Sequence, residues 1–141
     1  MAPTAISNLD KIHALLAAKG YAVSESGDGV LKIQEVGSGV SLRAVLEGDI
    51  LYFSLTCAVA PTGVFTTALM SKMLDADNGI STSYFQLHEM SDGNVAVTLN
   101  NFCKVQELGA DDEDDILSCV SFLLADVVHA KDLIGADLHT N

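Results

Sequence analysis

Apolar and polar positions in the first part of the chain predict a helix followed by a block of strands. The helix stripe repeats every three or four residues: Ile6, Leu9, Ile12, Leu15 and Leu16. Gly20 can close this helix in a left-handed conformation with Tyr21 packing back, and Thr4 or Ser7 is the expected N-cap. Between residues 21 and 59 the period changes to two and glycine-rich turns interrupt it. This pattern predicts an antiparallel meander with one buried face.

The stretch from Pro61 to Phe102 predicts a second helix followed by a hairpin. Pro61 suits the first turn of a helix, and Asp77–Asn78–Gly79 is typical of a helix end. Apolar residues occupy more than one face of this helix: Val64, Phe65, Ala68, Leu69, Met70, Met73 and Leu74. Two segments of period two follow at 84–88 and 95–100, and a polar, glycine-containing turn separates them.

The last part of the chain predicts one long helix with an acidic start. Five consecutive acids, Asp111 to Asp115, precede an apolar helical stripe that runs from Ile116 to Ile134. Acids at this place complement the partial positive charge of a helix N-terminus. Gly135 is expected to end the helix, and residues 136–141 are expected to form a flexible tail.

The complete order of elements is α-β-β-β(-β)-α-β-β-α. Strands in a block, with helices at the start, middle and end, predict an α+β fold in which helices pack on one face of an antiparallel sheet. At 141 residues, without a linker or repeat, the chain is expected to form a single domain, 1–141.

Charge and composition exclude several partners. The chain has 19 acids against 7 bases, a net charge of −12, so we expect no nucleic-acid partner, because phosphate binding needs a basic face. No apolar run approaches the roughly 20 residues of a membrane helix, and no secretory signal is visible. Cys57, Cys103 and Cys119 are odd in number and widely spaced, which favours core thiols in a reducing compartment. We therefore expect a cytoplasmic protein that does not insert into a membrane.

Motifs that would carry chemistry are incomplete. His88–Glu89 begins like a zinc-protease motif, but Asp92 stands where the second His is needed, and the segment has the period of a strand. Residues 75–79 resemble part of a calcium loop, but no Glu closes a loop of about 12 residues. Cys103 lies on a predicted strand, where a lone thiol indicates packing. We predict no catalytic residue, metal site, cofactor or enzymatic activity.

Two surfaces are candidates for binding. One face of the helix after Pro61 must cover the sheet, and the remaining apolar surface is a candidate dimer or partner interface. The residues predicted for this interface are Val64, Phe65, Leu69, Met70 and Met73. The alternative is that the helix is fully enclosed in the core. The second surface is the open face of the sheet, where Tyr52, Tyr84 and His88 are candidate ligand residues.

The central segments also carry a family resemblance. They are the helix Ala68–Leu74, its polar end Asn78–Gly79, the apolar-aromatic strand Tyr84–Leu87 and the aliphatic strand Val95–Leu99. With the order of elements, they resemble the type III secretion chaperone fold, which YbjN-like proteins share. The resemblance implies a homodimer built around the central helix, with Val64, Phe65, Leu69 and Met73 on the dimer face. It also implies that the protein binds protein segments without chemistry.

The resulting prediction is a non-enzymatic protein-binding module, chaperone-like or an adaptor, that acts as a homodimer on a protein or peptide client. The alternative is a small-ligand-binding or regulatory domain that uses the open sheet face. A deep pocket in which Tyr52, Tyr84 and His88 converge would support that alternative.

Overall fold

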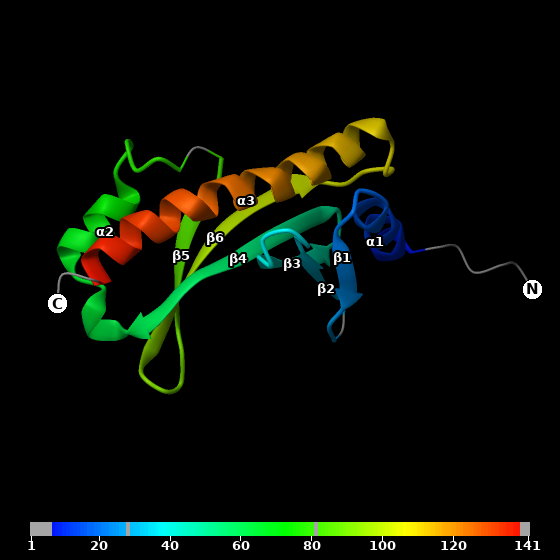
Figure 1. The fold of residues 1–141 in the computed structure, drawn as a ribbon. Coiled ribbons are helices and arrows are strands. Elements are labelled where there is room, and N and C mark those ends of the chain that lie inside the picture. The colour runs from blue at the N-terminus through cyan, green and yellow to red at the C-terminus, as the bar shows by residue number, and fades with distance from the viewer. Residues whose placement is uncertain (1–6, 28, 81, 139–141) are drawn as a thin grey trace, which may run out of the picture. The chain divides into compact units, whose positions relative to one another are not determined.

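The computed structural model describes residues 7–27, 29–80 and 82–138, and side chains as far as residue 135. This part of the chain forms an open, six-stranded antiparallel sheet with three α-helices and one 3₁₀ helix, η1 (Figure 1). The strand order is β1-β2-β3-β4-β6-β5. The elements are α1 (Asn8–Ala18), β1 (Ala22–Glu25), β2 (Val30–Gln34), β3 (Ser41–Glu47), β4 (Ile50–Pro61), η1 (Thr62–Val64), α2 (Thr67–Leu74), β5 (Tyr84–Glu89), β6 (Asn94–Lys104) and α3 (Ala110–Leu138). The predicted α+β class and order of elements are confirmed, with the fourth strand of the meander present.

The chain forms two compact units. Unit 1 comprises Met1–Phe53 and Phe102–Cys119, and unit 2 comprises Ser54–Asn101 and Val120–Asn141. The strands β4 and β6 and the helix α3 each contribute residues to both units. No linker separates the units along the chain, and the prediction of a single domain stays a prediction.

The ends of α1 follow the expected capping rules. Ser7 is the N-cap, and its hydroxyl accepts a hydrogen bond from the Asp10 N–H at 3.1 Å. Gly20 has a φ of 95°, and the Tyr21 N–H donates to the Leu16 carbonyl at 3.2 Å, as in a Schellman motif. The predicted helix end at Gly20 is confirmed, whereas the alternative cap, Thr4, lies outside the described residues.

The core of unit 1 is built on one face of its strands. Leu31 pairs with Ala44 and Ile33 pairs with Leu42 across β2 and β3, and all four side chains are buried. The other buried residues of this unit include Ile12, Leu16, Leu51, Phe53, Cys103, Val105 and Ile116. Because side chains alternate along a strand, the residues between these positions face the opposite side of the sheet.

The start of α3 is held by one acid. The Asp112 carboxylate oxygen Oδ2 accepts hydrogen bonds from the backbone N–H groups of Gln106 at 2.9 Å, Glu107 at 3.1 Å and Leu108 at 2.8 Å. Leu108 has a φ of 54°, a left-handed conformation that is unfavourable for a residue with a branched side chain. Asp112 thus closes the loop that precedes the helix, whereas the sequence predicted that the acids of this run serve the helix N-terminus itself.

The second helix begins later than predicted. Pro61 is the last residue of β4, and the N–H and hydroxyl of Thr62 both donate to the Gly93 carbonyl, at 3.3 and 2.9 Å. The helix α2 starts at Thr67 because the Thr66 hydroxyl accepts from the Leu69 N–H at 3.1 Å and so caps the first turn. A proline without an N–H is tolerated at the end of a strand as well as at the start of a helix.

The end of α2 also differs from the prediction. The helix ends at Leu74, and Asn78 stabilises a separate turn after it. The Asn78 side chain donates to the Met73 carbonyl and accepts from the Ile80 N–H at 2.9 Å. Gly79 does adopt the predicted left-handed conformation, with a φ of 84°, but in this turn and not in a helix cap.

The core of unit 2 joins both of its helices to its strands. Phe65, which lies just before α2, packs in one cluster with Leu69 and Met73 of α2. The cluster also contains residues of β4, β6 and α3, which are Ala60, Val95, Val97 and Ile134. Val95 and Val97 lie on the same face of β6. The helices α2 and α3 therefore cover one face of the sheet in this unit (Figure 1).

The helix α3 continues past the glycine that was expected to end it. It runs through Gly135 to Leu138, so the predicted tail at 136–141 begins as helix, and residues 139–141 lie outside the described part. A glycine inside a helix costs about 1 kcal/mol, which the burial of Ile134 beside it can offset. Among the described residues, no helix is long and apolar enough to cross a membrane.

Candidate functional site

The residues predicted for an interface on the second helix lie mainly in the protein's own core. Phe65, Leu69 and Met73 are only 8%, 0% and 3% exposed, so the structure places these three side chains in the core of the chain, and their part in a dimer or partner face stays a prediction. Their spacing of four residues gives a single stripe, which one sheet face can cover. Val64 and Met70 are half-buried at the margin of the same cluster. The large apolar side chain that α2 leaves exposed is Leu74, at 79% exposure.

The strand β5 lies at one edge of the sheet and pairs with β6 alone. The turn at residues 91–93 joins the two strands: Met90 N–H donates to the Asn94 carbonyl at 2.8 Å, and Gly93 has a φ of 85°. The Asp92 side chain accepts from the Asn94 N–H at 3.0 Å. The predicted hairpin is confirmed, and it leaves the outer backbone edge of β5 without a partner strand in the described part of the chain.

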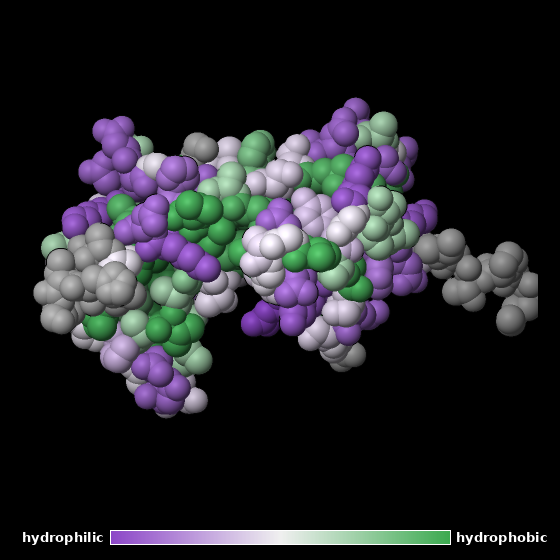
Figure 2. All heavy atoms as spheres, viewed as in Figure 1, coloured by the Kyte–Doolittle hydropathy of each residue, from purple (hydrophilic) through white to green (hydrophobic). Residues whose placement is uncertain are grey.

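Exposure distinguishes the edge strand from its neighbour. Tyr84, Leu87 and Met90 are each 43% exposed, whereas β6 is buried on both faces from Val97 to Asn101. Figure 2 shows hydrophobic residues at the surface beside the polar tip of this hairpin. We call Tyr84, Leu87 and Met90, together with the outer backbone of β5, the β5 edge surface. Sequence reasoning did not single out Leu87 or Met90, because a period of two does not reveal which strand of a hairpin is the outer one.

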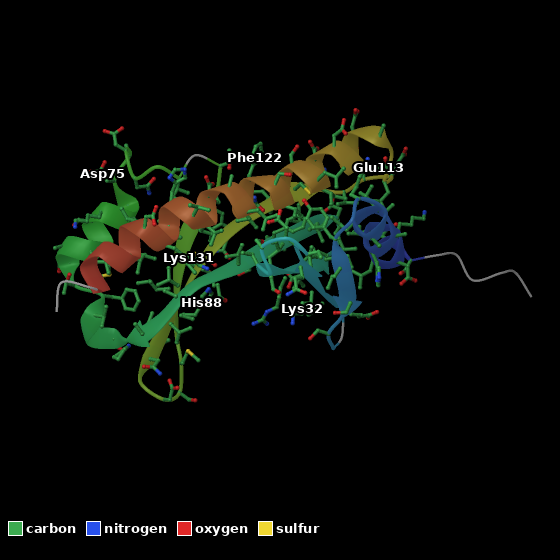
Figure 3. All side chains as sticks on the ribbon, viewed as in Figure 1. Lys32, Asp75, His88, Glu113, Phe122 and Lys131 are labelled. Carbon is green, nitrogen blue, oxygen red and sulfur yellow. The ribbon has the colours of Figure 1, made fainter. Side chains whose placement is uncertain are left out.

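The open face of β5 and β6 carries a polar network. The ring nitrogen Nε2 of His88 lies 3.0 Å from the Thr98 hydroxyl (Figure 3). The Asn100 amide donates to the same hydroxyl at 2.8 Å and to the Tyr84 carbonyl at 3.3 Å. Thr98 and Asn100 are buried, so these bonds satisfy groups that have lost contact with water. The network holds the His88 ring against β6 and links the Tyr84 backbone to Asn100.

The predicted ligand residues are divided between the two units. Tyr84 and His88 lie on one face of β5, opposite Asn100 and Ala96 of β6. Tyr52 belongs to unit 1, where its ring packs against Phe102 with a centroid distance of 6.1 Å. A hollow of about 410 Å³ in unit 1 is lined by other residues: Lys11, Ala14, Leu15, Ala18, Leu108 and Glu113. The small-ligand interpretation of Tyr52, Tyr84 and His88 stays a prediction.

One buried acid positions the start of β5. The Asp126 carboxylate on α3 accepts hydrogen bonds from the hydroxyls of Thr82 at 3.1 Å and Ser83 at 2.8 Å. Asp126 is buried, so these bonds supply part of the solvation that it has lost. The sequence held a signal for this contact, because Asp126 is an acid next to the apolar helical stripe that contains Leu123 and Val127.

The thiols have the environments of packing residues. Burial raises the pKa of Cys57 to about 11, which keeps it protonated at neutral pH. Cys103 and Cys119 share a hydrogen bond that raises the pKa of Cys103 and lowers the pKa of Cys119, while burial and Asp115 oppose ionisation of both. All three are free cysteines. Among the described residues, no group of three or more His, Cys, Asp or Glu side chains is placed to hold a metal ion.

Comparisons with known proteins concern the fold. No protein-family model matches the chain, and no curated protein matches its sequence. The crystal structure of YbjN from E. coli, a candidate transcription regulator, matches with a TM-score of 0.64. The match covers 95% of this chain and 94% of YbjN. The chain has a YbjN-like fold. At 18% identity the likeness to YbjN is one of fold alone, and it confirms the expected YbjN-like architecture. The type III secretion chaperone part of the resemblance stays a prediction.

Proposed function

We propose that the protein is a non-enzymatic protein-binding module, chaperone-like or an adaptor, that binds an extended segment of a client protein along the β5 edge surface. The observation that supports this proposal is an edge strand whose outer backbone side has no partner strand in the described part of the chain, with three exposed hydrophobic residues, Tyr84, Leu87 and Met90. An extended segment can add to such an edge as a new strand, in which backbone hydrogen bonds give affinity and alternate side chains give specificity.

The side chains of β5 suit such an added strand. Tyr84 projects on the open face, and Leu87 projects on the opposite face, so an added segment would meet an apolar residue on either side of the sheet. The net charge of −12 and the lack of Lys or Arg on β5 favour basic or apolar clients at this edge. The free cysteines are consistent with action in the cytoplasm. YbjN, as a candidate regulator, is compatible with a binding role of this kind.

Leu87→Asp is expected to weaken client binding by about tenfold or more, because it places a charge where an apolar client side chain would be buried. The client is reduced, carboxyamidomethylated and fluorescently labelled ribonuclease A, which is permanently unfolded and basic. Fluorescence anisotropy measures its Kd, and hydrogen exchange maps its site, with protection expected at Tyr84–Glu89.

Val128→Asp is the matched control, because Val128 is also an exposed apolar residue of unit 2 but lies on α3. We expect its Kd to stay within about twofold of the wild-type value. Equal losses in the two variants, or protection that spares β5, would show that the client binds elsewhere.

We further propose that two copies pair through the apolar surface that remains around α2. Val64 and Met70 are half-buried there, and Leu74 is exposed. The double variant Met70→Asp/Leu74→Asp is expected to sediment with the mass of one chain, and the wild type with the mass of two, because the variant introduces repelling charges at a self-complementary patch. Sedimentation velocity distinguishes the two masses. A wild type that sediments as a monomer at high concentration would refute the dimer and leave the client proposal standing.

A further inference from the structure

Unit 1 places two basic residues side by side on the open face of its sheet. Lys32 on β2 lies directly opposite Arg43 on β3. Both side chains are exposed, and both alternate with the buried positions Leu31, Ile33, Leu42 and Ala44, so they project away from the core. Figure 3 shows the position of Lys32. Like charges directly opposite each other on antiparallel strands are unfavourable. Neither residue forms an ion pair with a described residue that would relieve this repulsion.

Two aromatic rings extend the same face. Tyr52 on β4 and Phe102 on β6 alternate with the buried residues Leu51, Phe53 and Cys103, and therefore lie on the open side. They are 42% and 55% exposed, and their tilted rings pack together at 6.1 Å. Exposed aromatic residues that already contact each other form a preorganised apolar platform.

The face is basic in a chain that is strongly acidic. Lys104 follows Phe102 on the same side of β6, so three of the seven Lys and Arg residues lie here. Lys104 contacts Asp49 at 3.7 Å, but both side chains are more than half exposed, so this pair contributes little and can open. Glu47 lies at the end of the face, where β3 turns into β4. The arrangement combines an apolar platform with two positive charges, Lys32 and Arg43, that have no ion-pair partner among the described residues.

We propose that this basic-aromatic face, formed by Lys32, Arg43, Tyr52, Phe102 and Lys104, binds an acidic peptide segment whose apolar side chains cover the two rings. Carboxylates of the segment pair with Lys32 and Arg43 and remove their mutual repulsion. A peptide in which acids alternate with apolar residues fits this face better than a nucleic acid does. A nucleic-acid strand that extends past this small face would bring further phosphates against a protein of net charge −12, whereas a short peptide can end at the face. The face lies in unit 1, so the proposal is independent of the β5 edge surface of unit 2.

The test measures binding of a fluorescein-labelled peptide in which Asp or Glu alternates with Leu, by anisotropy at low ionic strength. Lys32→Glu/Arg43→Glu is expected to weaken binding by about tenfold or more. Phe102→Ser is expected to weaken binding by about fivefold without a change in charge. A peptide with Lys in place of the acids can bind elsewhere on this acidic protein, so the expected result is that Lys32→Glu/Arg43→Glu does not weaken its binding. A labelled oligo-dT strand is expected to bind more weakly than the acidic peptide.

The matched control is Lys11→Glu/Lys19→Glu, which makes the same change in net charge on α1 (Lys11) and its C-cap (Lys19) in the same unit. We expect this control to change the Kd by less than about threefold, because it alters only the long-range electrostatic potential of the protein. Equal losses in the two double variants would overturn the proposal, since the net charge alone would then explain binding. Tighter binding of oligo-dT than of the acidic peptide would assign the face to nucleic acid and would also overturn it. Circular dichroism of each variant confirms that it is folded.

Discussion

Leu69→Ala is expected to lower the free energy of unfolding by about 2–5 kcal/mol, which is a large fraction of the stability of a chain of this size. Leu69 is fully buried, and it packs with Phe65 and Met73 against the sheet of unit 2. Truncation removes apolar contacts and leaves a cavity that the close-packed strands can fill only in part. Urea denaturation followed by circular dichroism measures the change.

Leu74→Ala is the matched control, because it makes the same chemical change on the same helix at a side chain that is 79% exposed. Its free energy of unfolding is expected to stay within about 0.5 kcal/mol of the wild-type value. If instead Leu69→Ala were tolerated and separated a dimer into stable monomers, Leu69 would be an interface residue and the core assignment would be wrong.

Asp112→Ala is expected to lower the free energy of unfolding by about 1–3 kcal/mol. The variant removes the acceptor of three charge-assisted hydrogen bonds, from the N–H groups of Gln106, Glu107 and Leu108. It also removes the contact that holds Leu108 in its left-handed conformation. Thermal and urea denaturation measure the loss, and hydrogen exchange should show faster opening at residues 106–108.

Asp114→Ala is the control for Asp112→Ala, since Asp114 is an exposed acid of the same helix start. Both variants lose one negative charge at the positive end of the helix, so they share the effect of the helix dipole, about 0.3–1 kcal/mol. The excess loss in Asp112→Ala then measures the loop contacts. An equal loss in the two variants would mean that Asp112 acts only as one of several solvated acids.

The period and the capping residues of the sequence were sufficient to predict most of the fold. The alternation from residue 21 to residue 59 and the hairpin after residue 84 depend on which side chains face the core, and this is local information. Ser7 and Gly20 act as expected, because caps depend on residues within one turn. The helix start predicted at Pro61 and the helix end predicted at Gly135 were both wrong. A proline also fits the end of a strand, and buried neighbours can hold a glycine inside a helix.

The candidate surfaces were harder to predict, because they depend on strand order. Sequence reasoning could not tell that β6, and not β5, lies beside β4, and this order leaves Leu87 exposed and buries Leu99. The sequence overestimated the exposed apolar surface of α2. It does not show that residues of β4, β6 and α3 pack around this helix. The opposition of Lys32 and Arg43 required the register of β2 and β3.

The unpaired side of β5 also bears on how the protein behaves in acid. Edge strands of soluble proteins commonly carry lysine, proline or a bulge, which prevents pairing with a strand of another molecule. The strand Tyr84–Glu89 contains neither lysine nor proline. At neutral pH the 19 acids keep copies apart by mutual repulsion. Acidification toward the sequence pI of about 4.3 brings the net charge close to zero and removes this repulsion, so strands of neighbouring molecules can stack into ordered aggregates. Purification and crystallisation are therefore best carried out in neutral or mildly alkaline buffers.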